Sequence, residues 1–335
     1  MPWEKASDRE LLEMRICDLG VRIAGSWLEA PIRSVEHELA SRRLRVRPSF
    51  WLSDEWFSPE GVVGVAIPFF LAHRRLMRLE RRQMLEVEGG TLRECKKLLR
   101  HELGHAVQHA FELHRRPRWR AHFGRSSRPY PEHYRPNPAS RRSVLHLGHW
   151  YAQAHPDEDF AETFAVWLTP GARWRRYYAG WPALRKLEYV DELMSELAGR
   201  VPRVRTRARV EPASENRQTL REYYAAKHSR FSGVSNNIYD ADLERLFTRE
   251  PERGRGHSAA SFLRKNRARI RRMVSRGTGK REYALDVVLG EMIVRCRELG
   301  LRAGGDEEAL LTDFAILLAA RSVEYVYGGR EWHAL

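Results

Sequence analysis

The sequence predicts an α+β fold that is predominantly α, with a small N-terminal sheet, a long helix after it and a helical region at the C-terminal end. Three observations support this prediction. Two short apolar runs with strand character precede residue 70. The pentapeptide HELGH, residues 101–105, lies inside a pattern of helical period. Beyond residue 216 the apolar residues recur only at helical spacings.

The elements before the pentapeptide follow from the same periodicities. Residues 1–40 are expected to be mostly helical, because apolar residues recur there three and four apart. Alternation over 44–52 predicts a first strand, and the Val- and Ile-rich run 61–67 predicts a second. The second strand can pair with an extended substrate beside a cleft or be an ordinary core strand, and both interpretations stay open. Residues 71–87 form a basic amphipathic pattern that predicts a helix.

The HELGH stretch carries the strongest chemical signal. Residues four apart on a helix share one face, so His101 and His105 can offer two imidazole nitrogens to one metal ion while Glu102 lies beside the remaining coordination space. Zinc accepts neutral His nitrogens, and a catalytic zinc site needs three protein ligands and an open position for water. The sequence therefore predicts a Zn2+ site of the peptidase type, with Glu102 as its catalytic carboxylate.

A chance occurrence of this pentapeptide is the alternative, since the chain has 14 His in 335 residues. The surrounding pattern argues against chance. Thr91 and Glu94 have the spacing of a capping box, and the apolar positions that follow predict a helix over about 91–113. The motif thus lies within a helix, where the two His side chains can meet one ion.

A second helix supplies carboxylates. Pro156 suits a first helical position, and residues 157–159 place three acids in the first turn of a helix that ends near Leu168. Glu158 and Glu162 share a face, so Glu158 is the candidate third ligand and Glu162 can accept a hydrogen bond from a ligating His. His109 lies one turn beyond His105, away from His101, and is expected to be structural or at the surface.

With both motifs in view, HELGH followed by HPDEDFAETFA resembles a bacterial zinc-binding metallopeptidase family of gluzincin-like character, and more distantly the lethal-factor and Pro-Pro endopeptidase group. The resemblance implies a zincin-like fold in about the first 200 residues. It implies Glu158 as a zinc ligand, Glu162 as its neighbouring support and Tyr151 as a catalytic residue that assists the transition state. A metzincin is excluded, because Gln108 and Phe111 stand where that subclass has Gly and His.

The remaining segments complete the predicted organisation. The Pro- and Arg-rich stretch 114–142 is expected to be a loop without regular structure, and 171–199 a helical region. Residues 200–216 have the composition of a linker. We therefore expect a metallopeptidase domain at 1–205 and a helical accessory domain at 206–335.

Charge and composition limit the partners. The net charge is +15, but only seven of the 59 basic residues are Lys, and an Arg bias of this kind commonly reflects a GC-rich genome. Residues 114–142 carry a net +8 and 252–281 a net +10. Such runs can hold acidic protein, phosphate or nucleic acid, or be solvated faces. The charged N-terminus and the absence of a long apolar run predict a cytoplasmic protein with no membrane partner.

The predicted function is zinc-dependent hydrolysis of a peptide or isopeptide bond in a protein or peptide substrate, and the basic run 114–142 makes an acidic substrate one expectation. Two alternatives come from other classes. A binding protein could use zinc only to hold its fold together, although such a site does not need Glu102. A nucleic-acid-associated protein could use the Arg-rich surfaces, although no recognised binding motif accompanies the charge.

Overall fold

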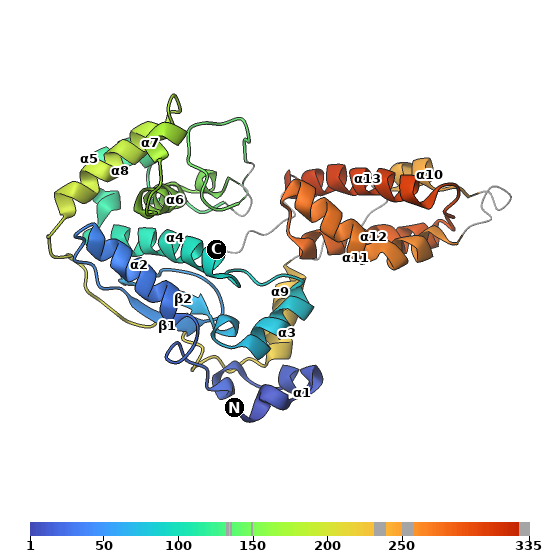
Figure 1. The fold of residues 1–335 in the computed structure, drawn as a ribbon, viewed down its shortest axis with the longest axis horizontal. Coiled ribbons are helices and arrows are strands. Elements are labelled where there is room, and N and C mark those ends of the chain that lie inside the picture. Colours follow the sequence, from blue (N-terminus) through green and yellow to red (C-terminus); the bar gives the residue numbers. More distant parts are fainter. Residues whose placement is uncertain (132–133, 135, 149, 231–238, 250–256, 328–335) are drawn as a thin grey trace. The chain divides into compact units, whose positions relative to one another are not determined.

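The computed structural model describes residues 1–131, 134, 136–148, 150–230, 239–249 and 257–327. The chain forms two compact units, each with its own core (Figure 1). Among the described residues, the first comprises Met1–Arg81 and Val87–Tyr224, and the second comprises Arg82–Glu86 and those from Ala225 to Tyr327. Helices predominate, and the one sheet of the described residues has two strands. The predicted fold class is therefore confirmed. That 1–205 and 206–335 act as separate domains stays a prediction.

The N-terminal region is less continuously helical than its apolar spacing indicated. Its α-helices are α1 (Asp8–Leu12) and α2 (Glu29–Ser41), with 3-10 turns at Pro2–Lys5 and Ile16–Leu19. Gly20 ends the second of these turns at φ +60°, a conformation that glycine adopts without steric cost and that no helix continues. Short segments therefore replace a single long helix.

The two predicted strands pair in parallel. β1 (Ser49–Ser53) lies beside β2 (Gly64–Pro68), and every residue of β2 is buried. On the other edge of β2, the Ala66 amide donates to the Phe57 carbonyl at 2.8 Å, and Ser58 Oγ donates to the Gly64 carbonyl at 2.8 Å. Both edges are thus occupied here, so β2 is a core strand and offers no free edge to a substrate.

The helices that follow bring the predicted motifs into the first unit. A 3-10 turn at Phe69–Ala72 leads into α3 (Arg74–Met84). Next comes α4 (Leu92–Phe111), which carries HELGH and whose N-cap, Thr91, accepts a hydrogen bond from the Glu94 amide. Helix α2 supports α4 through a bidentate pair between Glu38 and the Arg100 guanidinium at 2.7 and 2.8 Å. The second motif forms α6 (Pro156–Leu168), with the predicted bounds.

The stretch 114–142 is not a loop throughout, and that expectation was wrong. Residues Pro117–Phe123 form a helix, α5, with proline at its first turn. Trp119 and Phe123 lie one turn apart and are buried, and their rings contact Phe160 of α6 at centroid distances of 5.8 and 5.4 Å. Burial of these two aromatic side chains stabilises a short helix. The Pro and Arg content of the segment is typical of a loop and does not indicate this helix.

The rest of the first unit consists of two helices after α6 and an extended segment beside the sheet. Helices α7 (Trp174–Tyr177) and α8 (Ala183–Leu197) follow α6. The segment expected to be a linker runs along the sheet instead: the Val63 amide donates to the Thr206 carbonyl at 2.8 Å, and the Ala213 amide to the Leu52 carbonyl at 2.7 Å. Residues 200–216 are therefore an integral part of the first unit.

The second unit is a helical bundle. After α9 (Leu220–Ser229), which begins in the first unit, its helices are α10 (Asp240–Leu246), α11 (Ala259–Thr278), α12 (Glu282–Glu298) and α13 (Glu307–Tyr327). Its core is apolar, with Leu289, Met292 and Phe314 fully buried. None of the helices in the described part of the chain is long and apolar enough to cross a membrane.

Candidate metal centre

Helices α4 and α6 touch backbone to backbone at one point. A Cβ added to Gly104 would lie 2.7 Å from Ala161 Cα and 3.1 Å from the Ala161 carbonyl oxygen. Only a glycine fits this distance. Because Gly104 lies between the two His of HELGH, and Ala161 lies between Glu158 and Glu162, the close approach brings imidazoles and carboxylates within reach of one another.

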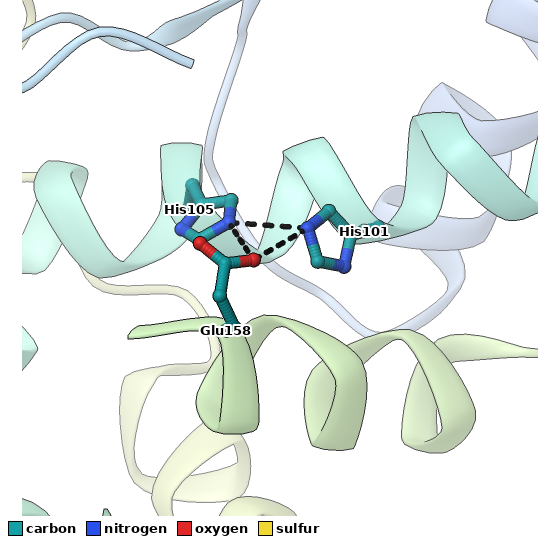
Figure 2. A group of neighbouring side chains, drawn as sticks. All are labelled: His101, His105 and Glu158. Carbon is teal, nitrogen blue, oxygen red and sulfur yellow. Dashed lines mark hydrogen bonds and ion pairs between the residues drawn. The ribbon is translucent and has the colours of Figure 1, made fainter. Parts of the chain in front are cut away.

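Three donor atoms converge at this crossing (Figure 2). Glu158 Oε2 lies 3.0 Å from His101 Nε2 and 3.3 Å from His105 Nε2. The two Nε2 atoms are 3.2 Å apart. All three side chains are buried. Residues from two helices more than 50 positions apart thus present three ligand atoms to one point.

The spacing of these atoms fits a zinc ion. Tetrahedral zinc with ligands at about 2.0 to 2.2 Å places neighbouring donors about 3.3 Å or slightly more apart, and the three donors here form a triangle within a few tenths of an ångström of that size. The donor set of two His and one carboxylate is also one that catalytic zinc sites use. His101, His105 and Glu158 are therefore placed to hold a metal ion. His109 is outside this group, and burial lowers its pKa to about 3.

Glu162 fixes the orientation of the first imidazole. Its Oε1 accepts from His101 Nδ1 at 3.0 Å, which leaves Nε2 of that ring for a metal. Its Oε2 accepts from the backbone amides of His146 at 3.3 Å and Leu147 at 2.8 Å. The sequence motif predicts the contact between Glu162 and His101. It does not indicate the contacts with the two backbone amides, which hold residues 146–147 against the same carboxylate.

The electrostatics of the cluster follow from burial and proximity. Burial alone would lower the pKa of His101, but its hydrogen bonds to Glu158 and Glu162 outweigh burial and raise that pKa well above its usual value. For Glu158, burial acts to raise the pKa, but the adjacent His105 and the hydrogen bonds to both imidazoles hold it well below the usual range. The carboxylate is therefore ionised at neutral pH, whereas His101 has to release a proton before it can bind a metal ion.

The three consecutive acids at the start of α6 have three different partners. Asp157 accepts from Gln108 Nε2 of α4 at 2.8 Å and from Ser126 Oγ at 2.8 Å. Glu158 faces the imidazoles. Asp159 is buried and pairs with Lys186 of α8, and burial raises its pKa to about 6 despite that pair. Only the middle acid belongs to the metal group, whereas its neighbours anchor the helix on either side.

Glu102 lies at the same crossing but has a different environment. Its side chain is 5% exposed, and burial raises the pKa of its carboxyl group. Among the described residues its carboxylate has no hydrogen-bond partner, unlike Glu158 and Glu162. Within the described part of the chain, Glu102 is thus the carboxylate of the cluster for which no hydrogen bond is found.

Tyr151 lies beside the centre. Its ring is 5.6 Å from the His101 ring, and its buried hydroxyl has no hydrogen-bond partner in the described part of the chain. The preceding residue, Trp150, has φ +53°, which is unusual for a bulky side chain. An unpaired buried hydroxyl costs about 1–3 kcal/mol. Backbone strain and an unpaired donor occur together at this point of the chain.

Tyr130 is a residue of the centre that sequence reasoning missed. It comes from the basic stretch, and its hydroxyl donates to Glu158 Oε1 at 2.9 Å. Its ring stacks on His155 at a centroid distance of 3.8 Å. Tyr130 lies in a segment without periodic structure, 28 residues before Glu158. No local pattern could have identified it.

The fold and the site together define a class: a mostly helical protein in which two buried His and a buried Glu are placed to hold a metal ion, with a further buried glutamate, Glu102, beside them. The comparisons agree with this class. Residues 74–171, from the start of α3 to the turn after α6, match the model of the family described as putative zinc-binding metallo-peptidase. The resemblance inferred from HELGH and HPDEDFAETFA is confirmed for this segment, whereas the bacterial origin and the lethal-factor likeness stay predictions. No curated protein and no solved structure matches the chain.

Proposed function

We propose that the protein is a zinc-dependent metallopeptidase that hydrolyses a peptide or isopeptide bond. The observation that carries the proposal is the triangle of His101 Nε2, His105 Nε2 and Glu158 Oε2, with edges of 3.0 to 3.3 Å, next to the buried carboxylate of Glu102. When bound, zinc supplies a Lewis acid that polarises the scissile carbonyl and lowers the pKa of water towards about 7. The family match supports the same chemistry.

Glu102 is the general base of this proposal. Its burial favours the protonated form, so its pKa is shifted towards the neutral range in which a base can both accept and return a proton. The carboxylate takes the proton of the attacking water and delivers it to the leaving amine. A zinc site that only stabilises the fold does not need this residue, and a buried carboxylate with no hydrogen-bond partner among the described residues favours the enzymatic proposal over a zinc-stapled binding protein.

Tyr151 is the proposed donor to the developing oxyanion. Its hydroxyl has no partner among the described residues, so a substrate oxygen could satisfy it without the loss of another hydrogen bond. Because this hydroxyl is buried, either the Tyr151 ring must turn or the substrate must displace the side chains that cover the hydroxyl before the contact can form. Once the contact has formed, its loss should cost up to ~3 kcal/mol of transition-state stabilisation, the value typical of an oxyanion donor.

The proposed partner is a protein or peptide, and acidic substrates are the proposed preference because 114–142 carries a net +8. The contacts of this segment weaken the preference. Arg116 and Arg118 form bidentate pairs with Glu196 and Glu192 of α8. Part of the positive charge is therefore already neutralised, and only the unpaired arginines can attract a substrate.

The experiment that tests the function compares the zinc-loaded wild-type protein with Glu102→Gln on a proteome-derived peptide library, with new N-termini identified by mass spectrometry. We expect site-selective cleavage by the wild type and none above background by the variant, because the amide preserves shape and cannot accept the water's proton. Zinc content measured on both samples must be equal. Equal cleavage by the two proteins, or no cleavage by the zinc-loaded wild type, contradicts the proposed function.

A further inference from the structure

Residues 124–130 cross the N-terminal end of α6 as a strap. At one end of the strap, Ser126 Oγ donates to Asp157 Oδ2 at 2.8 Å. At the other, the Tyr130 hydroxyl donates to Glu158 Oε1 at 2.9 Å. The same segment of the chain thus binds two consecutive acids of the first turn of α6, and the second of these acids belongs to the metal group.

His155 holds the middle of the strap and fixes the ring of Tyr130. Its Nδ1 accepts from the Asp157 amide at 3.2 Å as the N-cap of α6, and its Nε2 donates to the Arg128 carbonyl at 2.7 Å. With both nitrogens engaged, the imidazole cannot rotate. The phenol ring of Tyr130 stacks on it at 3.8 Å with an interplanar angle of 16°. A half-exposed tyrosine is thereby held in one orientation, with its hydroxyl directed at Glu158.

The two oxygens of Glu158 are consequently not equivalent. Oε2 faces the Nε2 atoms of His101 and His105 at 3.0 and 3.3 Å. Oε1 is occupied by the Tyr130 hydroxyl. A carboxylate with one oxygen hydrogen-bonded in this way presents a single oxygen to a metal ion, whereas an untethered carboxylate can rotate and offer both.

We propose that Tyr130 is a positioning residue of the metal centre, which holds Glu158 for coordination through one oxygen and makes metal retention depend on the strap. This inference rests on the metal site of the proposed function and not on hydrolysis. It has a consequence for substrate binding: any partner that lifts the strap from α6 also removes a hydrogen bond from a metal ligand. The basic stretch is thereby coupled to the centre by a contact as well as by its charge.

The first test measures the zinc dissociation constant of Tyr130→Phe by competition with a chromophoric chelator. We expect affinity to fall about 10-fold, at the lower end of what loss of a hydrogen bond to a ligand causes. Tyr151→Phe is the matched control. It removes a phenol hydroxyl beside the same centre that has no partner among the described residues, so zinc affinity should stay within twofold of wild type. Equal affinities of Tyr130→Phe and wild type would overturn the inference.

The second test separates positioning from a merely structural role. The Co2+-loaded proteins are compared by visible absorption, which loses intensity when a second carboxylate oxygen joins the coordination shell. We expect weaker bands in Tyr130→Phe and wild-type bands in Tyr151→Phe. Bands of wild-type intensity in a folded Tyr130→Phe protein contradict the proposal.

Should Tyr130→Phe fail to fold, Ser126→Ala loosens the strap at its other end. Weaker zinc binding by that variant supports the proposal, and unchanged binding overturns it. Zinc binding by a wild type that cleaves nothing defeats the proposed function alone.

Discussion

The crossing of α4 and α6 and the basic stretch 114–142 are both dense in ionisable groups, but the two regions differ in how far these groups are exposed to solvent. At the crossing, His101, Glu102, His105, Glu158 and Glu162 are each less than 10% exposed. In the basic stretch, Arg118 and its partner Glu192 keep 65% and 61% of their side chains exposed. One region buries its ionisable groups in a cluster, and the other pairs them in solvent.

The difference shows which charges are informative. Removal of ionised groups from water costs several kcal/mol each unless partners compensate, so a buried cluster of ionisable side chains indicates a site. Exposed pairs typically contribute about 0–1 kcal/mol and occur on ordinary surfaces. The total of +15 and the Arg-rich runs therefore say little about function, whereas five buried side chains on two helices carry the functional argument.

The sharpest test of the buried cluster replaces its two glutamates separately. Glu158→Ala removes a donor atom from the metal group and should abolish zinc retention through dialysis, as measured by elemental analysis. Glu162→Ala leaves all three donors but frees the His101 ring, so zinc affinity should weaken by roughly 10 to 100 fold.

The order of severity is the diagnostic result. If Glu162→Ala loses zinc more completely than Glu158→Ala, the two carboxylates have been assigned the wrong way round. Circular dichroism of the metal-free proteins checks that neither substitution unfolds the chain. This control is needed because Glu162 also accepts two backbone amides, from His146 and Leu147.

The second prediction concerns the contact that makes the cluster possible. Gly104→Ala places a Cβ 2.7 Å from Ala161 Cα, a backbone atom that cannot rotate away. The helices must separate, so we expect a loss of about 1–3 kcal/mol in unfolding free energy by denaturant titration, together with weaker zinc binding.

Gly290→Ala in α12 is the matched control for this helix position. A Cβ there meets only Arg267 Nη2, at 3.5 Å, an ordinary contact with a flexible side chain. The gain in helix propensity should then leave stability unchanged or raise it by up to about 1 kcal/mol. If the two substitutions change the unfolding free energy by similar amounts, the close approach of α4 to α6 at Gly104 is not what makes glycine necessary at this position.

Much of the centre follows from local sequence patterns. The period of α4, its Thr91 cap and the Pro156 start of α6 are encoded within a few residues, so both helices were predicted closely. The His101–His105 pair followed because residues four apart on a helix share a face, whereas Glu158 followed from its place in the second motif and from the family resemblance. The strands and the fold class were predicted for the same reason: each depends on a periodicity that is visible in a short window.

What the sequence concealed depends on contacts between distant segments. Tyr130 meets Glu158 from an aperiodic stretch, and Gly104 meets Ala161 across two helices 57 positions apart. The Pro and Arg content around helix α5 is typical of a loop, and the one-turn spacing of Trp119 and Phe123 is the local signal that indicates a helix there. The cap of α6 was also missed, since His155 is an unusual N-cap and acts through a ring nitrogen.

The smallest expected effect concerns the basic stretch and tests whether its free charge attracts substrate. Arg120 is exposed and has no ion pair within the described residues, whereas Arg118 is neutralised by Glu192. We expect Arg120→Ser to lower kcat/KM for an acidic peptide by about twofold at low salt and to leave a neutral peptide unchanged, because weakened long-range attraction slows capture only of opposite charge. The double variant Arg118→Ser/Glu192→Ser removes an ion pair at constant net charge and should change neither rate. The companion measurement is kcat/KM over a salt series. Exposed charges are screened over about 10 Å at 0.1 M salt, so the difference between Arg120→Ser and wild type should disappear as the salt concentration rises to that value. If acidic and neutral peptides respond alike to salt and to Arg120→Ser, the basic stretch acts on the centre through Tyr130 alone.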